Sequence, residues 1–204
     1  WEDDSANANF MDSQRAYQNG QFSALQREFA SYGFTSSAHW FRVAIYNARV
    51  TSRDLILSVP KPLLDSVDVY CQLNQGRTYY YPLGEQTDFE RRRLKVRHYA
   101  VPLTLKGGSR AECYFRVVTT SNLSMNLTIS DADVFLENES ASQWISGLFY
   151  GVAFSILVGM GILYIVMRDP VHLYYMVHFL GGFGFSSMAD GSLFSFWSFL
   201  AVEN

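Results

Sequence analysis

The sequence predicts a mainly β fold, a jelly-roll β-sandwich, followed by transmembrane α-helices. Two observations lead to this prediction. Short segments in the first two thirds of the chain alternate apolar and polar residues, and a later run of 24 residues, Trp144 to Met167, carries no charge. Strict alternation is typical of strands with one buried face. A run of about 20 apolar residues is long enough to cross the ~30 Å hydrocarbon layer of a membrane.

The charged residues are divided very unevenly along the chain. Of the 19 acidic residues all but Asp169, Asp190 and Glu203 precede Trp144, and of the 16 basic residues all but Arg168 do so. The first part is therefore a polar, nearly neutral domain that is large enough to bury one core. Its charge balance argues against nucleic acid as a partner.

Residues 1–34 form an amino-terminal segment that we expect to be partly irregular, with a short helix over Gln18 to Ala30. The chain opens with Trp1-Glu-Asp-Asp4 and has neither the basic n-region nor the apolar h-region of a signal peptide. We expect either that a signal peptide was removed or that the chain starts downstream of one.

The β domain is expected over residues 35–136. Its first strand is predicted by Phe41, Val43 and Ile45, which alternate with residues of the opposite face. Further strands are expected, in chain order, near residues 55–59, 67–73, 78–81, 94–101, 113–118 and 125–129. Strands this short at this spacing make a sandwich or a jelly roll.

The membrane region follows a short linker, residues 137–143. We expect a first transmembrane helix over 144–167, a polar break at Arg168-Asp169-Pro170 and a second transmembrane helix over 171–189. Residues 192–204 are expected to begin a third, truncated span. A buried core helix rarely continues this far without a charge, so we favour spans over the core of a soluble protein.

Arg168 is the only basic residue between the two expected spans. Cytoplasmic loops are enriched in Lys and Arg, so this loop is expected in the cytoplasm. The amino-terminal domain then lies on the other side. In a bacterium this is a multi-pass protein of the inner membrane with a periplasmic domain.

Cys71 and Cys113 are the only cysteines in the chain, and both sit among apolar strand residues. They could form one disulfide in the periplasm, or each could be a buried free thiol. The sequence leaves both alternatives open.

Several segments resemble the periplasmic ligand-binding domain, second type, of the seven-transmembrane receptors with diverse intracellular signalling modules. In the β domain they are Trp40-Phe-Arg42 leading to Asn47, Leu64-Asp-Ser-Val67 leading to Val69-Tyr70, Gly84, Pro102 and Tyr114-Phe-Arg-Val117. In the membrane region they are Gly147-Leu-Phe-Tyr-Gly151, Tyr164, Arg168-Asp169, Leu173-Tyr-Tyr175 and Gly191. The resemblance covers residues 35 to about 200.

This resemblance implies a bacterial receptor whose jelly-roll ectodomain, likened to carbohydrate-binding modules, senses a small polar molecule or a saccharide. Its transmembrane helices would pass the signal to a cytoplasmic output absent from this chain, a histidine kinase of a two-component system or a diguanylate cyclase that makes cyclic di-GMP. Two alternatives are a membrane-anchored carbohydrate-binding or adhesion module without output, and a transporter-accessory subunit. The length of the native gene would separate them.

The candidate ligand-binding residues project from the face opposite the predicted core, because they have the other parity of their strands. Aromatic faces stack on sugar rings, and Arg side chains donate to hydroxyls or carboxylates. The candidates are Trp40, Arg42, Tyr46, Tyr70, Tyr114 and Arg116. In the alternative interpretation Trp40 and Tyr114 fill a second layer of core, and the two arginines pair with Asp65 or Asp68.

The sequence contains no P-loop, G-x-S-x-G, H-E-x-x-H, C-x-x-C or kinase signature. We therefore expect no enzymatic activity from this chain, no cofactor and no metal site. The expected partners are a small-molecule or saccharide ligand, the lipid bilayer, and a second copy or partner receptor that associates through the membrane region.

The orientation can be tested with alkaline phosphatase, which is active only in the periplasm. A fusion after Asn138 should be active and a fusion after Asp169 inactive, because positive-inside places Arg168 in the cytoplasm. The reverse pattern of activity would contradict the predicted orientation.

Overall fold

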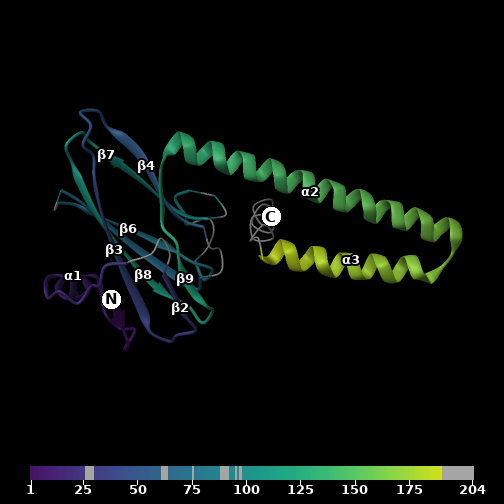
Figure 1. Cartoon of the computed structure of the whole chain (residues 1–204), viewed down its shortest axis with the longest axis horizontal. Helices are drawn as coiled ribbons and strands as arrows, with labels where there is room; N and C mark the ends of the chain where they lie inside the picture. The colour runs from purple at the N-terminus through teal and green to yellow at the C-terminus, as the bar shows by residue number, and fades with distance from the viewer. Residues whose placement is uncertain are drawn as a thin grey trace, which may run out of the picture. The chain divides into compact units, whose positions relative to one another are not determined.

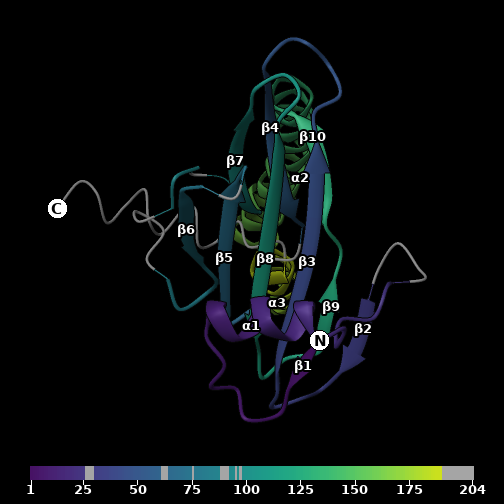
Figure 2. The same ribbon diagram turned by 90° about the vertical axis from the view of Figure 1, so that its left-hand side faces the viewer.

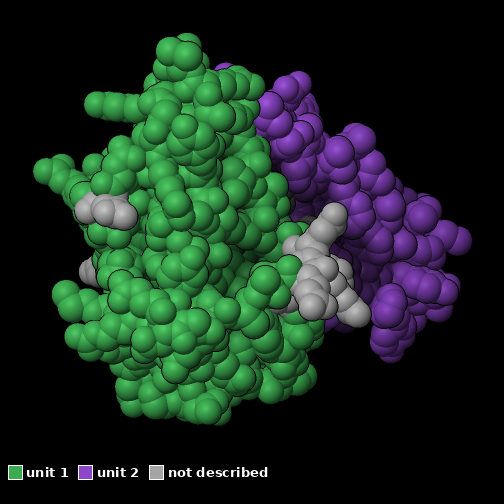
Figure 3. Space-filling model, turned by 60° about the vertical axis from the view of Figure 1, so that its left-hand side comes forward, with its two compact units in different colours: residues 1–132 green, residues 133–204 purple. Residues whose placement is uncertain are grey.

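The computed structural model describes residues 1–25, 30–60, 64–74, 76–87, 92–94, 96 and 98–189. The chain divides into two compact units, Trp1–Ala132 and Asp133–Asn204 (Figure 3). The first unit carries the β-strands and one short helix, and the second carries two long helices (Figure 1). The predicted mainly β fold followed by an apolar helix is confirmed.

The strands form three antiparallel sheets. The largest has the order β1 (Glu2–Asp3), β3 (Ala38–Tyr46), β8 (Arg110–Val118), β5 (Ser66–Leu73) and β6 (Thr78–Leu83). A second sheet has the order β10 (Thr128–Asp131), β4 (Arg53–Val59) and β7 (Tyr99–Leu105), and β2 (Ala30–Gly33) pairs with β9 (Leu123–Met125). The jelly-roll connectivity stays a prediction.

The core lies between the two larger sheets, as the alternation of apolar residues predicts. Val69 and Phe115 of the first sheet and Leu57 and Val101 of the second are at most 1% exposed and belong to one hydrophobic cluster. Phe41 packs against this cluster. Strands β3, β5, β6 and β8 therefore turn their odd-numbered residues inward and their even-numbered residues to the opposite face.

Two of the predicted strands differ from the structure. The strand expected at 94–101 is β7, which starts at Tyr99 and continues through Pro102. Proline has no N–H to donate to a neighbouring strand, so it is rare in a strand that pairs on both sides. Because β7 lies at the edge of its sheet, proline is tolerated there. The strand expected at 125–129 is two strands, β9 and β10, which belong to different sheets.

The amino-terminal segment 1–34 contributes β1, β2 and helix α1 (Phe10–Gln18). The helix begins at Asn9, whose side chain accepts from the N–H groups of Met11 and Asp12. The Asp12 carboxylate in turn accepts from the Asn9 N–H at 3.0 Å, which completes a capping box. The helix predicted at Gln18–Ala30 is wrong over residues 19–25, which are not helical, since α1 ends at Gln18. Residues 26–29 lie outside the described residues.

Helix α2 (Ala132–Met167) starts directly after β10, so residues 137–143, expected to be a linker, are helical. At 36 residues it is about 54 Å long, more than the ~30 Å of hydrocarbon. Among the described residues it is the one helix long and apolar enough to cross a membrane.

Helix α3 (Pro170–Ala189) follows, and the rings of Tyr150 and Phe183 meet at 5.2 Å. That residues 171–189 also span the membrane stays a prediction. Residues 192–204 lie outside the described residues.

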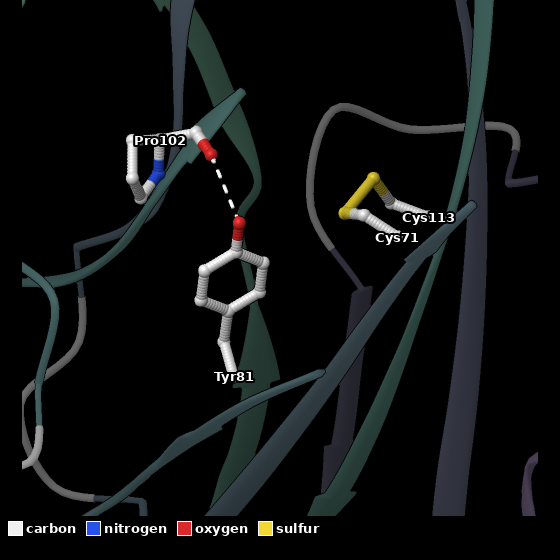
Figure 4. The surroundings of a disulfide bond; sticks show 4 residues. All are labelled: Cys71, Tyr81, Pro102 and Cys113. Atoms are coloured by element: carbon white, nitrogen blue, oxygen red, sulfur yellow. Dashed lines mark hydrogen bonds between the residues drawn. A yellow bond between two sulfur atoms is a disulfide. The ribbon is translucent and has the colours of Figure 1, made fainter. Parts of the chain in front are cut away.

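Of the two alternatives for the cysteines, the structure forms the disulfide (Figure 4). Cys71 of β5 lies directly opposite Cys113 of β8, with their Cα atoms 4.1 Å apart and both side chains fully buried. The disulfide ties together two neighbouring strands of the first sheet and suits an oxidising compartment.

Replacing both cysteines, Cys71→Ala with Cys113→Ala, should lower the free energy of unfolding by about 4 kcal/mol, because the bond closes a loop of 42 residues in the unfolded chain. Urea unfolding of the whole chain in detergent, followed by the circular dichroism of the β domain, measures this. A loss below about 1 kcal/mol would contradict the expected role of the bond.

Candidate functional site

The register of the first sheet aligns five of the six candidate residues in two rows across its outer face. In one row Arg42 is opposite Tyr114, which is opposite Tyr70. In the other, Trp40 is opposite Arg116. We call this surface the aromatic face; it consists of Trp40, Arg42, Asp68, Tyr70, Tyr80, Tyr114 and Arg116.

Tyr46, the sixth candidate, has the predicted parity but lies apart. It ends β3 opposite Arg110 and is 65% exposed. Four residues of strand, about 13 Å, separate it from Arg42. The structure therefore does not bring Tyr46 together with the other five.

Tyr70 is at the centre of a group of stacked rings. Its ring lies 5.0 Å from Tyr80, 6.1 Å from Trp40 and 4.9 Å from Phe10, each stacked. Offset stacks of this kind contribute about 0.5–1.5 kcal/mol beyond the area that they bury. The aromatic face is thus a continuous apolar surface with polar groups at its edge.

The amino-terminal residues cover this surface. Helix α1 lies across β3, β8 and β5 (Figure 2). Phe10 and Phe22 each meet the Tyr114 ring edge-on, at 5.4 and 6.3 Å, and Trp1 stacks on Trp40 at 6.5 Å. We call residues 1–22 the covering segment.

Arg42 is held between charged and aromatic groups. One guanidinium nitrogen, Nη2, lies 2.8 Å from the Glu112 carboxylate, and Nε donates to the Tyr114 hydroxyl at 3.2 Å. The guanidinium carbon is 3.7 Å from the centre of the Tyr17 ring, a cation–π contact. Burial disfavours the charge, but the hydrogen bonds to Glu112 and Tyr114 outweigh it and raise the pKa of Arg42.

Arg116 joins the sheet to the covering segment. Its Nη1 lies 3.4 Å from the Asp68 carboxylate, and its Nη2 donates to the backbone carbonyl of Ala6 at 2.6 Å. Tyr80 donates to the other oxygen of Asp68 at 2.7 Å. Burial, and then this hydrogen bond to a carboxylate, raise the pKa of Tyr80, which is therefore a neutral donor at ordinary pH.

In these contacts the candidate residues are arranged as in the alternative interpretation, in which the aromatic residues form a second layer of core and the arginines form ion pairs. Trp40 and Tyr114 are 0% and 2% exposed, as in a second layer of core, and Arg116 pairs with Asp68. Arg42 pairs with Glu112 instead of an aspartate. A role of these residues in ligand binding then requires that the covering segment can move away from the aromatic face.

One polar atom in this layer has no partner. The indole Nε1 of Trp40 is buried and has no hydrogen-bond partner among the described residues. A buried donor without an acceptor costs about 1–3 kcal/mol. With the covering segment in place, the indole N–H of Trp40 therefore lacks an acceptor in the described part of the chain.

The sequence reasoning missed the covering segment. Phe10, Tyr17 and Phe22 are scattered in a polar stretch and have no strand-like alternation. The signal that could have found α1 is the spacing Asn9-x-x-Asp12, which places a side-chain acceptor at the cap and a carboxylate three residues later.

The chain was compared with known proteins. A family model described as 7TMR-DISM extracellular 2 matches residues 1–131. No curated protein matches the chain. Two solved structures are similar to parts of it: a Bacillus thuringiensis Cry1Da tryptic core variant, with 10% identity and a TM-score of 0.33, and a family GH115 4-O-methyl-α-glucuronidase with specificity for decorated arabinogalactans, with 8% identity and a TM-score of 0.29.

These two likenesses are confined to parts of the molecules. They cover 53% and 51% of this chain but only 21% and 14% of the other two. At such TM-scores neither likeness supports a conclusion about this chain.

Substitution by alanine should lower the free energy of unfolding far more at Trp40 than at Tyr46. Trp40→Ala removes a fully buried aromatic side chain and should lower the free energy of unfolding by about 3–5 kcal/mol. Tyr46→Ala, on the exposed end of the same strand, should change it by no more than about 0.5 kcal/mol. Urea unfolding of both variants of the whole chain in detergent tests this, and equal losses would contradict the placement of Trp40.

Proposed function

The chain belongs to the 7TMR-DISM extracellular 2 family, and from this premise we propose that its β domain is the ligand-sensing part of a bacterial inner-membrane receptor. The family and the apolar helix α2 make the chain a membrane protein with an amino-terminal sensor domain outside the cytoplasm. The ligand, the further spans and the output are our proposal.

The ligand is a small polar molecule or a saccharide, held on the aromatic face. Tyr70 and Trp40 offer flat rings for stacking, and Arg42 and Arg116 supply charged donors at the edge. A stacking ring and a charged donor contribute about 1–3 kcal/mol each, so a ligand relying on both binds in the micromolar range or more weakly.

The signal leaves the domain through β10. This strand ends at Asp131, and α2 begins at the next residue, Ala132. The guanidinium of Arg53 on β4 binds the Asp131 carboxylate. Its Nη2 donates to both carboxylate oxygens, at 2.8 and 2.7 Å, and its Nε donates to Oδ1 at 3.0 Å. These hydrogen bonds lower the pKa of Asp131 and raise that of Arg53, so both stay charged at neutral pH.

The observation that carries this proposal is the direct continuity of β10 and α2. A helix is far stiffer than a Gly/Ser-rich linker, so a displacement of β10 reaches the membrane without being lost in a flexible tether. Transmembrane helices then pass it to a histidine kinase or a diguanylate cyclase on the cytoplasmic side. A second copy or a partner receptor associates through the membrane region, and the chain itself catalyses no reaction.

The continuity can be tested in the full-length receptor by insertions at Ser140, inside α2. A flexible Gly-Ser insertion should abolish the response of the output to ligand, because it breaks the helix. The matched control is a seven-residue, Ala-rich helical insertion at the same site. Seven residues are about two turns, so the helix keeps its stiffness and nearly its rotation, and the response should persist. Equal responses from both variants would contradict a mechanical route through α2.

A further inference from the structure

The covering segment places on the aromatic face the kinds of group that a ligand would supply. The Phe10 ring stacks on Tyr70, in the manner of a sugar ring on an aromatic side chain. The Ala6 carbonyl accepts from Arg116, as a hydroxyl or carboxylate oxygen would. Each of these contacts satisfies a group of the proposed binding surface from within the chain.

The segment is anchored at one end. Strand β1 pairs with β3, Glu2 opposite His39 and Asp3 opposite Ala38, and the Trp40 N–H donates to the Trp1 carbonyl at 2.8 Å. The Asp3 carboxylate then organises a turn by accepting from the N–H groups of Ser5 and Ala8. Strand β1 therefore keeps the chain attached to the sheet even when the residues after it move.

Helix α1 is held more weakly than β1. Helix α1 has nine residues, and its buried residues are the small Ser13 and Ala16. Met11 and Tyr17 are 67% and 41% exposed. A helix of this length is marginal by itself even with a good cap, so it depends on its contacts with the sheet.

The unpartnered Nε1 of Trp40 is an independent observation that points to a ligand. It is a buried donor on β3, at one end of the aromatic face, and the cover supplies no acceptor for it. A ligand that carries acceptor oxygens on a flat ring could satisfy this donor and also take the place of Phe10 and the Ala6 carbonyl.

We infer that residues 5–22 are a detachable cover that competes with the ligand for the aromatic face, so that ligand binding and release of α1 are coupled. The inference rests on the proposed function, and it adds the regulation of the site and the class of ligand, a ring compound rich in acceptor oxygens. The apparent affinity is then the intrinsic affinity multiplied by the open fraction, so a cover open about 1% of the time weakens binding about 100-fold.

Detachment is tested without any ligand, by amide hydrogen exchange of the whole chain in detergent. The amides of α1 should exchange at least about 100-fold faster than those of β8, because they need only local opening. Equal rates for α1 and β8, with the same dependence on denaturant, would mean that α1 opens only when the domain unfolds, and would overturn the inference.

Two substitutions on α1 form a matched pair for this experiment. Phe10→Ala removes two ring contacts, to Tyr70 and Tyr114, and should speed exchange of α1 by about tenfold or more while β8 is unchanged. Met11→Ala, at an exposed position of the same helix, should leave both rates unchanged. No acceleration in Phe10→Ala would show that the ring contacts do not hold the cover.

Competition is tested with glucose, glucuronate and glycine as probes, by thermal shift and by exchange. A probe that binds should bind Phe10→Ala at least about tenfold more tightly than wild type, and it should speed exchange of α1 in wild type. Equal binding to both proteins, or slower exchange of α1, would overturn the competitive role and leave the proposed function standing. If no probe binds either protein, the saccharide site fails and the competitive role fails with it.

Discussion

Strand β8 pairs with β3 on one side and with β5 on the other, and the alternation of its side chains gives the sheet two faces that both need cover. Its odd-numbered residues, Cys113, Phe115 and Val117, are at most 1% exposed and pack into the sandwich. Tyr114, on the opposite face, is only 2% exposed. One sheet therefore needs two layers of packing, one from the second sheet and one from the amino-terminal residues.

This constraint explains which parts of the fold the sequence predicts. Alternation is a local property, so the strands near residues 41, 57 and 69 and their buried faces could be read from neighbouring residues. Whether a strand can continue through Pro102 depends on whether that strand lies at the edge of its sheet. This is set by pairing with residues distant in sequence. Helix α1 is short and polar, and its position depends on a cap and on contacts with the sheet, which periodicity does not reveal.

The candidate site was predictable to the same extent. Strand parity and side-chain type, aromatic or Arg, selected Trp40, Arg42, Tyr70, Tyr114 and Arg116. The structure brings these five together because directly opposed residues of antiparallel strands share a face. Parity also selected Tyr46, since it carries no information about distance along the strand. The covering segment could not be found in this way, because its aromatic residues acquire their meaning only from the rings that they meet.

The proposed binding surface and the strand that leads to the membrane belong to different sheets, and this limits how a signal can travel. The aromatic face is on the sheet of β3, β8 and β5, whereas β10 pairs with β4 in the other. Between the two sheets lies the close-packed core. Protein interiors of this kind have low compressibility and transmit a displacement instead of absorbing it. Tyr81 of β6 also crosses the sandwich, donating to the Pro102 carbonyl of β7 at 3.4 Å (Figure 4). Since β7 and β10 both pair with β4, the proposed signal has a path from the first sheet to Asp131 with a single intervening strand. The ion pair between Arg53 and Asp131 then ties β4 to the last residue before α2.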